Sequence, residues 1–352
     1  MYTITLEVNQ ICNLQCAYCY LGDKTNQSMS DQVAYRGLEI AFLNAEKHKD
    51  RKLWVDFVGG EALISFPFLQ KLVEYTEKEA YKRNILVSYS ITTNGTIMNN
   101  EILTWLIKYR VLLKLSIDGD QETHDRNRKT AFGAGSYINV IKNRDYFRKH
   151  EEKTKRWIQT AHVVTQNNYW EAFRSVQHLV ENLNFRMIDT SIDVSCSWTI
   201  EQLDELGEEW ENILCYYIKR REDKKDFFWI PVSDLKKYGE RLENSGFCGV
   251  GLIQIYVKTN GGIYGCAANL GESGYLGNVD QGLLAHKIKK YRELAKVSTM
   301  CSDCAIHRKC QSKKCIMNNL SYCGLLDGHN PNICYFERKK IRLFEKYRMK
   351  IE

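Results

Sequence analysis

The stretch CNLQCAYCY, residues 12–20, places three cysteines within eight positions. A closed structural zinc site takes four protein ligands and a disulfide takes two, so three thiols match neither. Thiolates are soft ligands that suit iron–sulfur clusters, in which each cysteine binds its own iron. A four-iron cluster held by Cys12, Cys16 and Cys19 leaves one iron open. The spacing therefore predicts a cluster that binds a small molecule directly.

A second group of cysteines lies near the other end of the chain, which has 13 in all. Its members are Cys248, Cys266, Cys301, Cys304, Cys310, Cys315, Cys323 and Cys334. The opening residues have no secretory signal pattern and no apolar run has membrane-spanning length, so we expect a cytoplasmic protein. The cytoplasm keeps thiols reduced, which makes metal binding the expected role of these cysteines. A zinc ribbon around Cys301 and Cys304 is the alternative to iron–sulfur clusters.

Composition excludes several classes of partner. The net charge of +7 is spread along the chain, and the basic runs at 142–156 and 338–350 are spaced like solvated helix faces. We therefore expect neither nucleic acid nor a membrane as a partner. With 44% hydrophobic residues and only 3 prolines, the chain is expected to be globular throughout.

Alternating strand and helix patterns must position the first cysteine group. Strands are predicted at 3–8, 53–58, 86–92, 112–117, 158–165 and 187–194, and helices at 31–48, 67–83, 101–109, 137–150 and 169–182. Ser30 is the expected N-cap of the first helix. Six βα units in a row predict a parallel sheet, either doubly wound or rolled into part of a barrel.

Unusual residues follow the carboxyl ends of these strands. The segments are CNLQCAYCY, GGEAL (59–63), TTNGT (92–96), SIDG (116–119) and TQNN (165–168). In a barrel-like parallel fold these ends share one face, so we expect five loops around one cavity. Cys196 follows the sixth strand on that face, where it would donate a hydrogen atom or simply pack as a small hydrophobe.

The spacing Cys-x3-Cys-x2-Cys, with Tyr18 before the last cysteine and the other loops in order, resembles the radical S-adenosylmethionine superfamily over at least residues 5–195. The resemblance implies an α/β fold, a partial (β/α)6 TIM-like barrel, with a [4Fe-4S] cluster that binds S-adenosylmethionine. It also implies that Tyr18 contacts the adenine, while Gly59 and Gly60 let the backbone approach the cofactor.

The same resemblance assigns polar contacts to the cofactor. Glu61 would accept a hydrogen bond from the ammonium group, and Ser116 and Asp118 would bind the ribose. Arg128, in the segment HDRNR, is preferred to Arg126 as the partner of the methionine carboxylate. Position 62 is Ala where the family usually has proline.

The second cysteine group resembles the SPASM extension of radical enzymes that modify peptides. The resemblance implies two auxiliary four-iron clusters, an outer one on Cys301, Cys304, Cys310 and Cys334 and an inner one on Cys248, Cys266 and Cys315. Either Cys323 supplies the eighth ligand, or one auxiliary cluster keeps an iron without a protein ligand. Two features depart from the family: the spacing of four residues between positions 310 and 315, and the lack of a cysteine a few residues after position 248. The expected domains are 1–195 (partial barrel), 196–245 (helical connector), 246–335 (SPASM) and 336–352 (basic helix).

The expected function is that of a maturase that installs a thioether or carbon–carbon cross-link in a ribosomally made precursor peptide. Sulfatase maturation is the nearest alternative, but those relatives carry a basic aspartate where this chain has Ala267, so Asp118, Glu272 or another acid would have to replace it. Peptide epimerisation, which would use Cys196, and a non-catalytic cluster scaffold that binds a peptide are further alternatives. Expected partners are a reductant such as flavodoxin or ferredoxin and a leader peptide held by the connector, the basic helices or a separate leader-binding protein.

Overall fold

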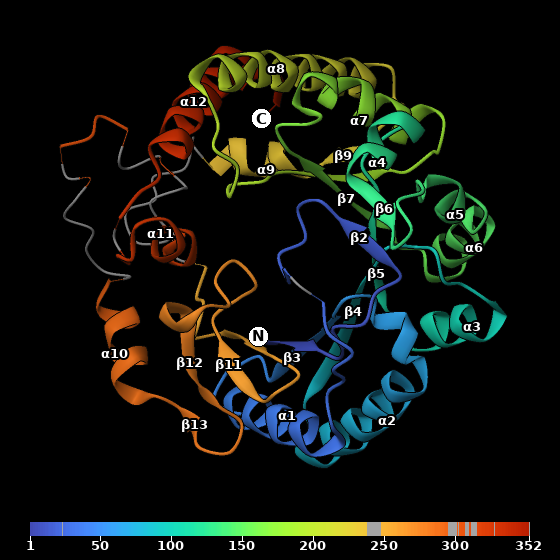
Figure 1. Ribbon diagram of the computed structural model, residues 1–352, viewed down its shortest axis with the longest axis vertical. Coiled ribbons are helices and arrows are strands. Elements are labelled where there is room, and N and C mark those ends of the chain that lie inside the picture. Colours follow the sequence, from blue (N-terminus) through green and yellow to red (C-terminus); the bar gives the residue numbers. More distant parts are fainter. Residues whose placement is uncertain are drawn as a thin grey trace.

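The fold is organised around one mixed sheet of 11 strands, in the order β13-β12-β11-β10-β1-β3-β4-β5-β7-β8-β9 (Figure 1). The computed structural model describes residues 1–22, 24–237, 248–294, 301, 303–306, 310, 315–326 and 328–351. Six neighbouring strands are parallel: β1 (Tyr2–Glu7), β3 (Lys52–Val58), β4 (Leu86–Thr93), β5 (Leu112–Ser116), β7 (Gln159–Val164) and β8 (Met187–Ile192). The prediction of six consecutive βα units around a parallel sheet is therefore confirmed, with strand bounds shifted by one or two residues at most ends.

Helices connect these strands and lie along the outside of the curved sheet (Figure 1). They are α1 (Asp31–Ala45), η1 (Ala62–Ser65), α2 (Phe66–Arg83), α3 (Asn100–Lys108), α4 (Gln121–Asn127), α5 (Tyr137–Ile141), α6 (Arg144–Thr154), η2 (Tyr169–Glu171) and α7 (Ala172–Glu181). The Ser30 hydroxyl accepts from the Val33 N–H, as expected of an N-cap. The helix predicted at 137–150 is wrong as a continuous element, because it is interrupted at Lys142 and Asn143.

The two faces of the parallel strands differ in chemistry. Along β1, Tyr2, Ile4 and Leu6 are buried with the helices in the hydrophobic core, and the side chains between them point to the opposite face. On neighbouring strands that opposite face carries ionised groups, with Lys114 Nζ 3.0 Å from Asp56 Oδ1. The inner face of the curved sheet is therefore polar.

The C-terminal part of the chain extends the same sheet. Strand β10 (Gln254–Val257) pairs parallel with β1, and β11 (Gly262–Tyr264), β12 (Tyr275–Asn278) and β13 (Gly282–Leu283) follow antiparallel. Strands β10 and β11 form a hairpin that turns at residues 258–261, where Gly261 has φ +84°, a conformation that favours glycine. Its union with β1 was not predicted. Elements η3 (Glu272–Gly274), α10 (Ala285–Leu294) and α11 (Ile316–Cys323) complete this region.

The connector is mostly one long helix that pairs with the last helix of the chain. Helix α8 (Ile200–Glu222) begins with a capping box on Thr199 and is followed by β9 (Phe228–Trp229) and α9 (Ile230–Lys237). Helix α12 (Pro331–Ile351) packs on it, with Trp210 and Phe336 edge to face at 5.4 Å. Because α12 begins at Pro331, it crosses the expected boundary between 335 and 336. Residues 238–247, where the connector was expected to meet the cysteine-rich region, lie outside the described residues.

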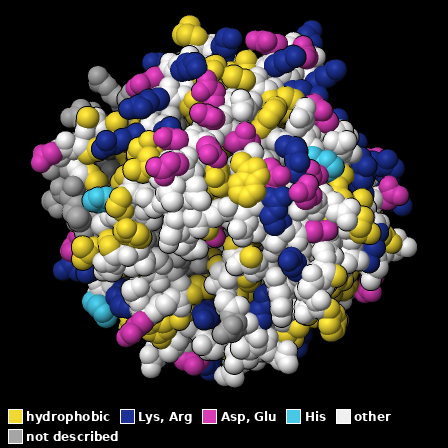
Figure 2. All heavy atoms as spheres, turned by 45° about the horizontal axis from the view of Figure 1, so that its top comes forward, with side chains coloured by type: hydrophobic (Ala, Val, Ile, Leu, Met, Phe, Trp, Pro, Cys, Tyr) yellow, Lys and Arg dark blue, Asp and Glu magenta, His cyan; other side chains and the backbone are white. Residues whose placement is uncertain are grey.

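The surface carries charges of both signs. Figure 2 shows basic and acidic side chains interspersed over the upper part of this face, rather than one sign gathered in a patch. Within the part of the chain that the structure describes, no helix combines the length and apolarity needed to cross a membrane.

Candidate cofactor and substrate site

The first three cysteines lie together beyond the end of β1. Cys16 ends the short strand β2 (Leu14–Cys16), which pairs with β6 (Arg128–Thr130) so that Cys16 is opposite Arg128. Burial raises the pKa of the Cys12 and Cys16 thiols, and a Cys19 thiolate raises both further, while Lys24 lowers them. Three thiols that disfavour one another's ionisation are suited to a bound cation, which would relieve that repulsion.

The arrangement of these thiols tests which metal group they fit. Among the described residues, no three His, Cys, Asp or Glu side chains are close enough to hold a single metal ion. A four-iron cluster gives each thiolate a different iron, so its ligands stand apart. The triplet therefore fits a cluster better than it fits one zinc ion.

The diglycine after β3 packs against the backbone that leads to Cys12. Gly60 N donates to Asn9 O at 3.0 Å, and Glu61 N donates to Ile11 O at 2.8 Å. A Cβ on Gly59 would lie 2.6 Å from Asn9 O, and one on Gly60 would lie 2.4 Å from Ile11 O. The close approach that these glycines permit is thus to the chain itself, and it fixes the start of the cysteine loop.

The Glu61 carboxylate ties the same loop to the end of β4. It is 1% exposed and accepts hydrogen bonds from Leu63 N at 3.0 Å, Thr93 Oγ1 at 2.8 Å and Asn94 N at 2.6 Å. Burial raises the pKa of Glu61, against the effect of these donors. Its expected contact with an ammonium group stays a prediction, and the structure adds a positioning role.

Asn94 reaches the cysteine loop from β4. Its side-chain amide donates to Asn13 Oδ1 at 2.9 Å and lies 3.9 Å from Cys12 Sγ. Donors beside a ligating sulfur orient it and tune the metal. This contact was not predicted, because nothing in the sequence indicates which way the Asn94 amide points.

Asp118 and Arg128 form a buried ion pair beside Tyr18. Arg128 Nε lies 2.9 Å from Asp118 Oδ2, and the Tyr18 hydroxyl donates to the same oxygen at 2.5 Å. The Arg128 guanidinium is 5.1 Å from the centre of the Tyr18 ring. Burial raises the pKa of Asp118, but Arg128 and His124 outweigh it and the net shift is downward. Ser116, at the end of β5, pairs in register with Ala161 and is half-buried.

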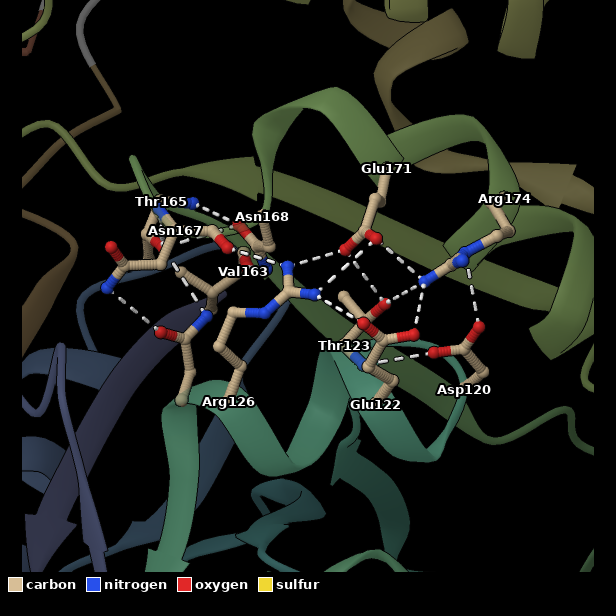
Figure 3. A network of polar contacts seen from close by, with 11 residues as sticks. Asp120, Glu122, Thr123, Arg126, Val163, Thr165, Asn167, Asn168, Glu171 and Arg174 are labelled. Carbon is tan, nitrogen blue, oxygen red and sulfur yellow. Dashed lines mark hydrogen bonds and ion pairs between the residues drawn. The ribbon is translucent and has the colours of Figure 1, made fainter.

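Arg126 belongs to a different network, on the outer side of α4 (Figure 3). Its Nη1 donates to Glu171 Oε2 at 2.6 Å and to Asn167 O at 2.9 Å, and its guanidinium lies 5.4 Å from the Trp170 ring centre. Arg174 shares Glu171 with Arg126 and also forms an ion pair with Asp120. This network fastens α4 to the segment after β7. Of the two arginines, Arg128 is the one that lies opposite Cys16.

A cavity of about 1080 Å³ opens beside the cysteine loop. Its walls come from the first cysteine loop, from the segment after β8, from the segment after β11 and from helix α11. The lining residues used below are Tyr18, Cys19, Asp193, Cys196, Lys258 and Ala267. A second cavity, of about 490 Å³, shares residues 194–197 with the first. Because they share these wall residues, the two adjoining cavities are together called the groove, and each is one of its lobes.

The C-terminal cysteines form two groups. Burial, together with thiolates at Cys310, Cys301 and Cys304, raises the pKa of Cys334 to about 11.

The second of these groups is built on Cys266. Burial raises its pKa to about 12, with Cys315 and Cys248 adding to the effect. Cys323 is exposed, and its thiol donates to Asn319 O at 3.3 Å. The structure thus brings the members of each set that the resemblance implied close together and places Cys323 against a main-chain carbonyl, while the roles of these cysteines as cluster ligands stay predictions.

Known proteins resemble this chain in sequence. A family described as "4Fe-4S single cluster domain" matches residues 4–142. The serine-type anaerobic sulfatase-maturating enzyme of Bacteroides thetaiotaomicron is 24% identical over 361 residues, which span 91% of this chain and 84% of that protein. The radical SAM cyclopropyl synthase TigE of Paramaledivibacter caminithermalis is 22% identical over 361 residues, spanning 97% and 72%. Over nearly its full length the chain is similar to radical S-adenosylmethionine enzymes. It is therefore an enzyme, with 4Fe-4S clusters and S-adenosylmethionine as its cofactors.

A solved structure agrees with this fold. "Native anSMEcpe with bound AdoMet and Cp18Cys peptide" superposes with a TM-score of 0.80 at 20% identity, covering 99% of this chain and 97% of that one. The likeness extends through the C-terminal strands. The radical S-adenosylmethionine enzyme described here therefore shares its mixed α/β architecture, with a large and mainly parallel sheet.

Two cavity residues of this radical S-adenosylmethionine enzyme were missed by sequence reasoning. Asp193 follows β8, and Lys258 follows β10. Asp193 had a detectable signal, since it stands at a strand's carboxyl end like the segments that were selected. Lys258 had none, because its strand was not expected to pair with β1. Cys196 lines both cavities, on the face where it was expected.

Proposed function

We propose that this enzyme is a maturase that modifies an internal residue of a peptide or protein segment. The groove carries the proposal: its two cavities share the walls at residues 194–197, and the larger one is bordered by the cysteine loop on one side and by the cysteine-rich region on the other. Such a shape suits an extended chain better than a compact metabolite. Bound S-adenosylmethionine would supply a 5′-deoxyadenosyl radical, as is general for cofactor-borne radical chemistry.

The residues around the cofactor are proposed to act either as ligands of the cluster or as contacts of S-adenosylmethionine. Cys12, Cys16 and Cys19 would hold the cluster that binds S-adenosylmethionine. Asp118 and Arg128 would bind S-adenosylmethionine through their remaining lone pairs and N–H groups, since each side chain is already oriented by the other. Gly59, Gly60, Glu61, Ser116 and Tyr18 would complete the pocket at the carboxyl ends of the strands.

The auxiliary clusters are proposed to divide as the two thiol groups do. Cys301, Cys304, Cys310 and Cys334 would hold the outer cluster, and Cys248, Cys266 and Cys315 the inner one, in a SPASM region spanning 246–335. Cys323 is left out of this proposal because its thiol is directed to Asn319 O. The partial barrel would span 1–195, with the connector at 196–245 and the basic helix at 336–352.

Cross-link formation is the proposed reaction, with sulfatase maturation as the second candidate. Ala267 lines the cavity without an acid at that position, which favours the first. Asp118 does not replace that acid, because Arg128, Tyr18 and Val163 N already use its carboxylate. The second candidate is supported by the 24% identity to a sulfatase-maturating enzyme over 91% of this chain.

One anaerobic assay separates these candidates. The reconstituted enzyme is incubated with S-adenosylmethionine, dithionite and either a sulfatase-derived peptide or a short cysteine-rich peptide encoded beside the gene. A cross-link appears as a peptide that has lost two hydrogens and does not react with a hydrazide. Formylglycine appears as a hydrazide-reactive aldehyde, and epimerisation as deuterium uptake from heavy water without net oxidation. Absence of 5′-deoxyadenosine with every peptide would leave only the non-catalytic scaffold.

The partners and compartment follow from the same proposal. A precursor peptide is the proposed substrate, and a flavodoxin or ferredoxin the proposed reductant. The leader segment is proposed to bind the connector, the basic helices or a separate protein. The reduced thiols that cluster assembly needs make the cytoplasm the proposed location.

A further inference from the structure

Removing two hydrogens from a peptide needs a base as well as a radical. If the proposed function holds, one hydrogen leaves as an atom, taken by the 5′-deoxyadenosyl radical. The other must leave as a proton, which needs an acceptor within hydrogen-bond reach of the peptide, and the electron left behind must pass to a one-electron oxidant, a role that the proposed auxiliary iron–sulfur clusters would fill. Because Ala267 provides none, the acceptor must come from another wall of the groove.

The acidic side chains near the groove differ in whether a peptide bound there can reach them. Glu7 is 0% exposed and accepts from Tyr256 and Thr259, and Glu61 and Asp118 are also buried among their own donors. Glu272 is exposed but does not line the cavity. Among the described residues that line the larger cavity, Asp193 has the only carboxylate and Lys258 the only cationic group.

Asp193 is held firmly in the cavity wall. Its N–H donates to Val164 O at 2.8 Å, which joins it to the end of β7. Its carbonyl accepts from Trp198 Nε1 at 2.8 Å, and Trp198 is 5% exposed. These contacts fix the main chain from two sides, so the side chain projects from a rigid support.

The Asp193 carboxylate is oriented but not fully used. Oδ1 accepts from Ser195 N at 2.9 Å and from Ser195 Oγ at 2.6 Å. Cys196 lies beyond Ser195 and lines both lobes of the groove. Burial raises the pKa of the Cys196 thiol, and Asp193 raises it further against a Gln166 N–H, so the thiol stays protonated. Asp193 also lies next to residues 194–197, where the two lobes of the groove meet.

We propose that Asp193 is the base that takes a proton from the bound peptide. In this step the X–H bond of a peptide thiol, hydroxyl or amide breaks, its electron pair stays on X, and the proton forms an O–H bond on Asp193. The step needs no oxidant of its own. It rests on the proposed function and assigns to Asp193 the role that the missing acid at position 267 would have had.

The test is Asp193→Asn, which keeps an oxygen for Ser195 but removes the basic carboxylate. With S-adenosylmethionine and a peptide that the wild type modifies, we expect 5′-deoxyadenosine release within about threefold of wild type and modified peptide lowered about 10²- to 10⁴-fold. Glu272→Gln is the matched control and should retain both signals.

Each other outcome overturns the assignment. Normal product formation by Asp193→Asn would mean that the proton leaves by another route. Loss of both 5′-deoxyadenosine and product, at unchanged iron content, would mean that Asp193 positions the peptide without acting as its base. Loss of product in Glu272→Gln alone would transfer the role to Glu272. Failure of the proposed function has a different signature, since the wild type itself would then yield no modified peptide, and both proposals would fall together.

Discussion

The Arg128 guanidinium contacts both oxygens of the Asp118 carboxylate, at 2.9 Å from Nε to Oδ2 and 3.2 Å from Nη2 to Oδ1. The two side chains are 6% and 0% exposed, so neither charge is solvated by bulk water. Each is therefore compensated chiefly by the other, at the point where the expected ribose and carboxylate contacts meet.

Removing the cation of this pair should strongly destabilise the fold. Arg128→Met leaves Asp118 as a buried, uncompensated charge, and we expect the free energy of unfolding to fall by about 3–5 kcal/mol in urea titrations at neutral pH. Arg148→Met is the control, because the Arg148 side chain is 67% exposed and its ion pairs should contribute less than about 1 kcal/mol. Adding Asp118→Asn should recover part of the loss, because the unpaired charge is then gone. Equal stability of the two single variants would contradict a compensating role for Arg128.

Acid should weaken the fold through His162. It is 0% exposed, its ring nitrogens lack hydrogen-bond partners among the described residues, and burial lowers its pKa to about 4. The unfolded chain takes up this proton near pH 6.5 and the folded chain only near pH 4, so stability falls as pH decreases through that window. Between pH 7 and pH 5, the free energy of unfolding of His162→Leu should fall by about 2 kcal/mol less than that of the wild type.

The control for this pH effect is His286→Gln, which changes an exposed histidine. Its unfolding free energy should depend on pH as that of the wild type does. If His162→Leu and wild type lost the same stability between pH 7 and pH 5, the acid sensitivity would come from other groups.

A methyl group on Gly60 should disturb the first cysteine loop. In Gly60→Ala the new Cβ would meet Ile11 O at 2.4 Å, so the backbone before Cys12 must move. We expect lower iron content after anaerobic reconstitution and loss of most 5′-deoxyadenosine formation. Gly37→Ala is the control, since its Cβ would make ordinary contacts from 3.5 Å and should stabilise α1 by up to about 1 kcal/mol. Normal activity of Gly60→Ala would show that the loop does not need this close approach.

Iron content tests the proposed ligand groups. Three four-iron clusters predict about 12 irons per chain, falling to about 8 when Cys12, Cys16 and Cys19 are all replaced by Ala. Cys334→Ala should also lower the value toward about 8, whereas Cys323→Ala should leave it unchanged. A native value near 8 would mean one auxiliary cluster, and no difference between native protein and the triple variant would contradict the first cluster.

Local patterns predicted the elements better than their partners. The run at 53–58 is apolar and β-branched between polar residues, and the strand observed there is Lys52–Val58. The pairing of β10 with β1 had no local signal, because hydrogen bonding between strands leaves no periodicity in either one. Strands β9 and β13 have two residues each, too short for any alternation to be visible.

The site shows the same division. The resemblance to the SPASM extension divided the C-terminal cysteines into two sets, and the structure places the members of each set near one another, although their roles as ligands stay predictions. The mutual ion pair of Asp118 and Arg128 was not predicted, since ten residues of separation do not reveal which side chains face each other. The engagement of the Glu61 carboxylate by Asn94 was missed for the same reason, as it depends on how two loops meet.

The position of β1 in the sheet constrains the order in which the protein becomes complete. This strand, which leads directly to Cys12, lies between β3 and β10, and its Glu7 accepts a hydrogen bond from Tyr256, 249 positions later in the sequence. During synthesis the N–H and C=O groups on one edge of β1 therefore stay unpaired with β10 until residues 254–257 have left the ribosome. A nascent chain stopped before that point would expose the edge that supports the first cysteine loop, and assembly of the two cysteine regions is thereby coupled to a single late folding event.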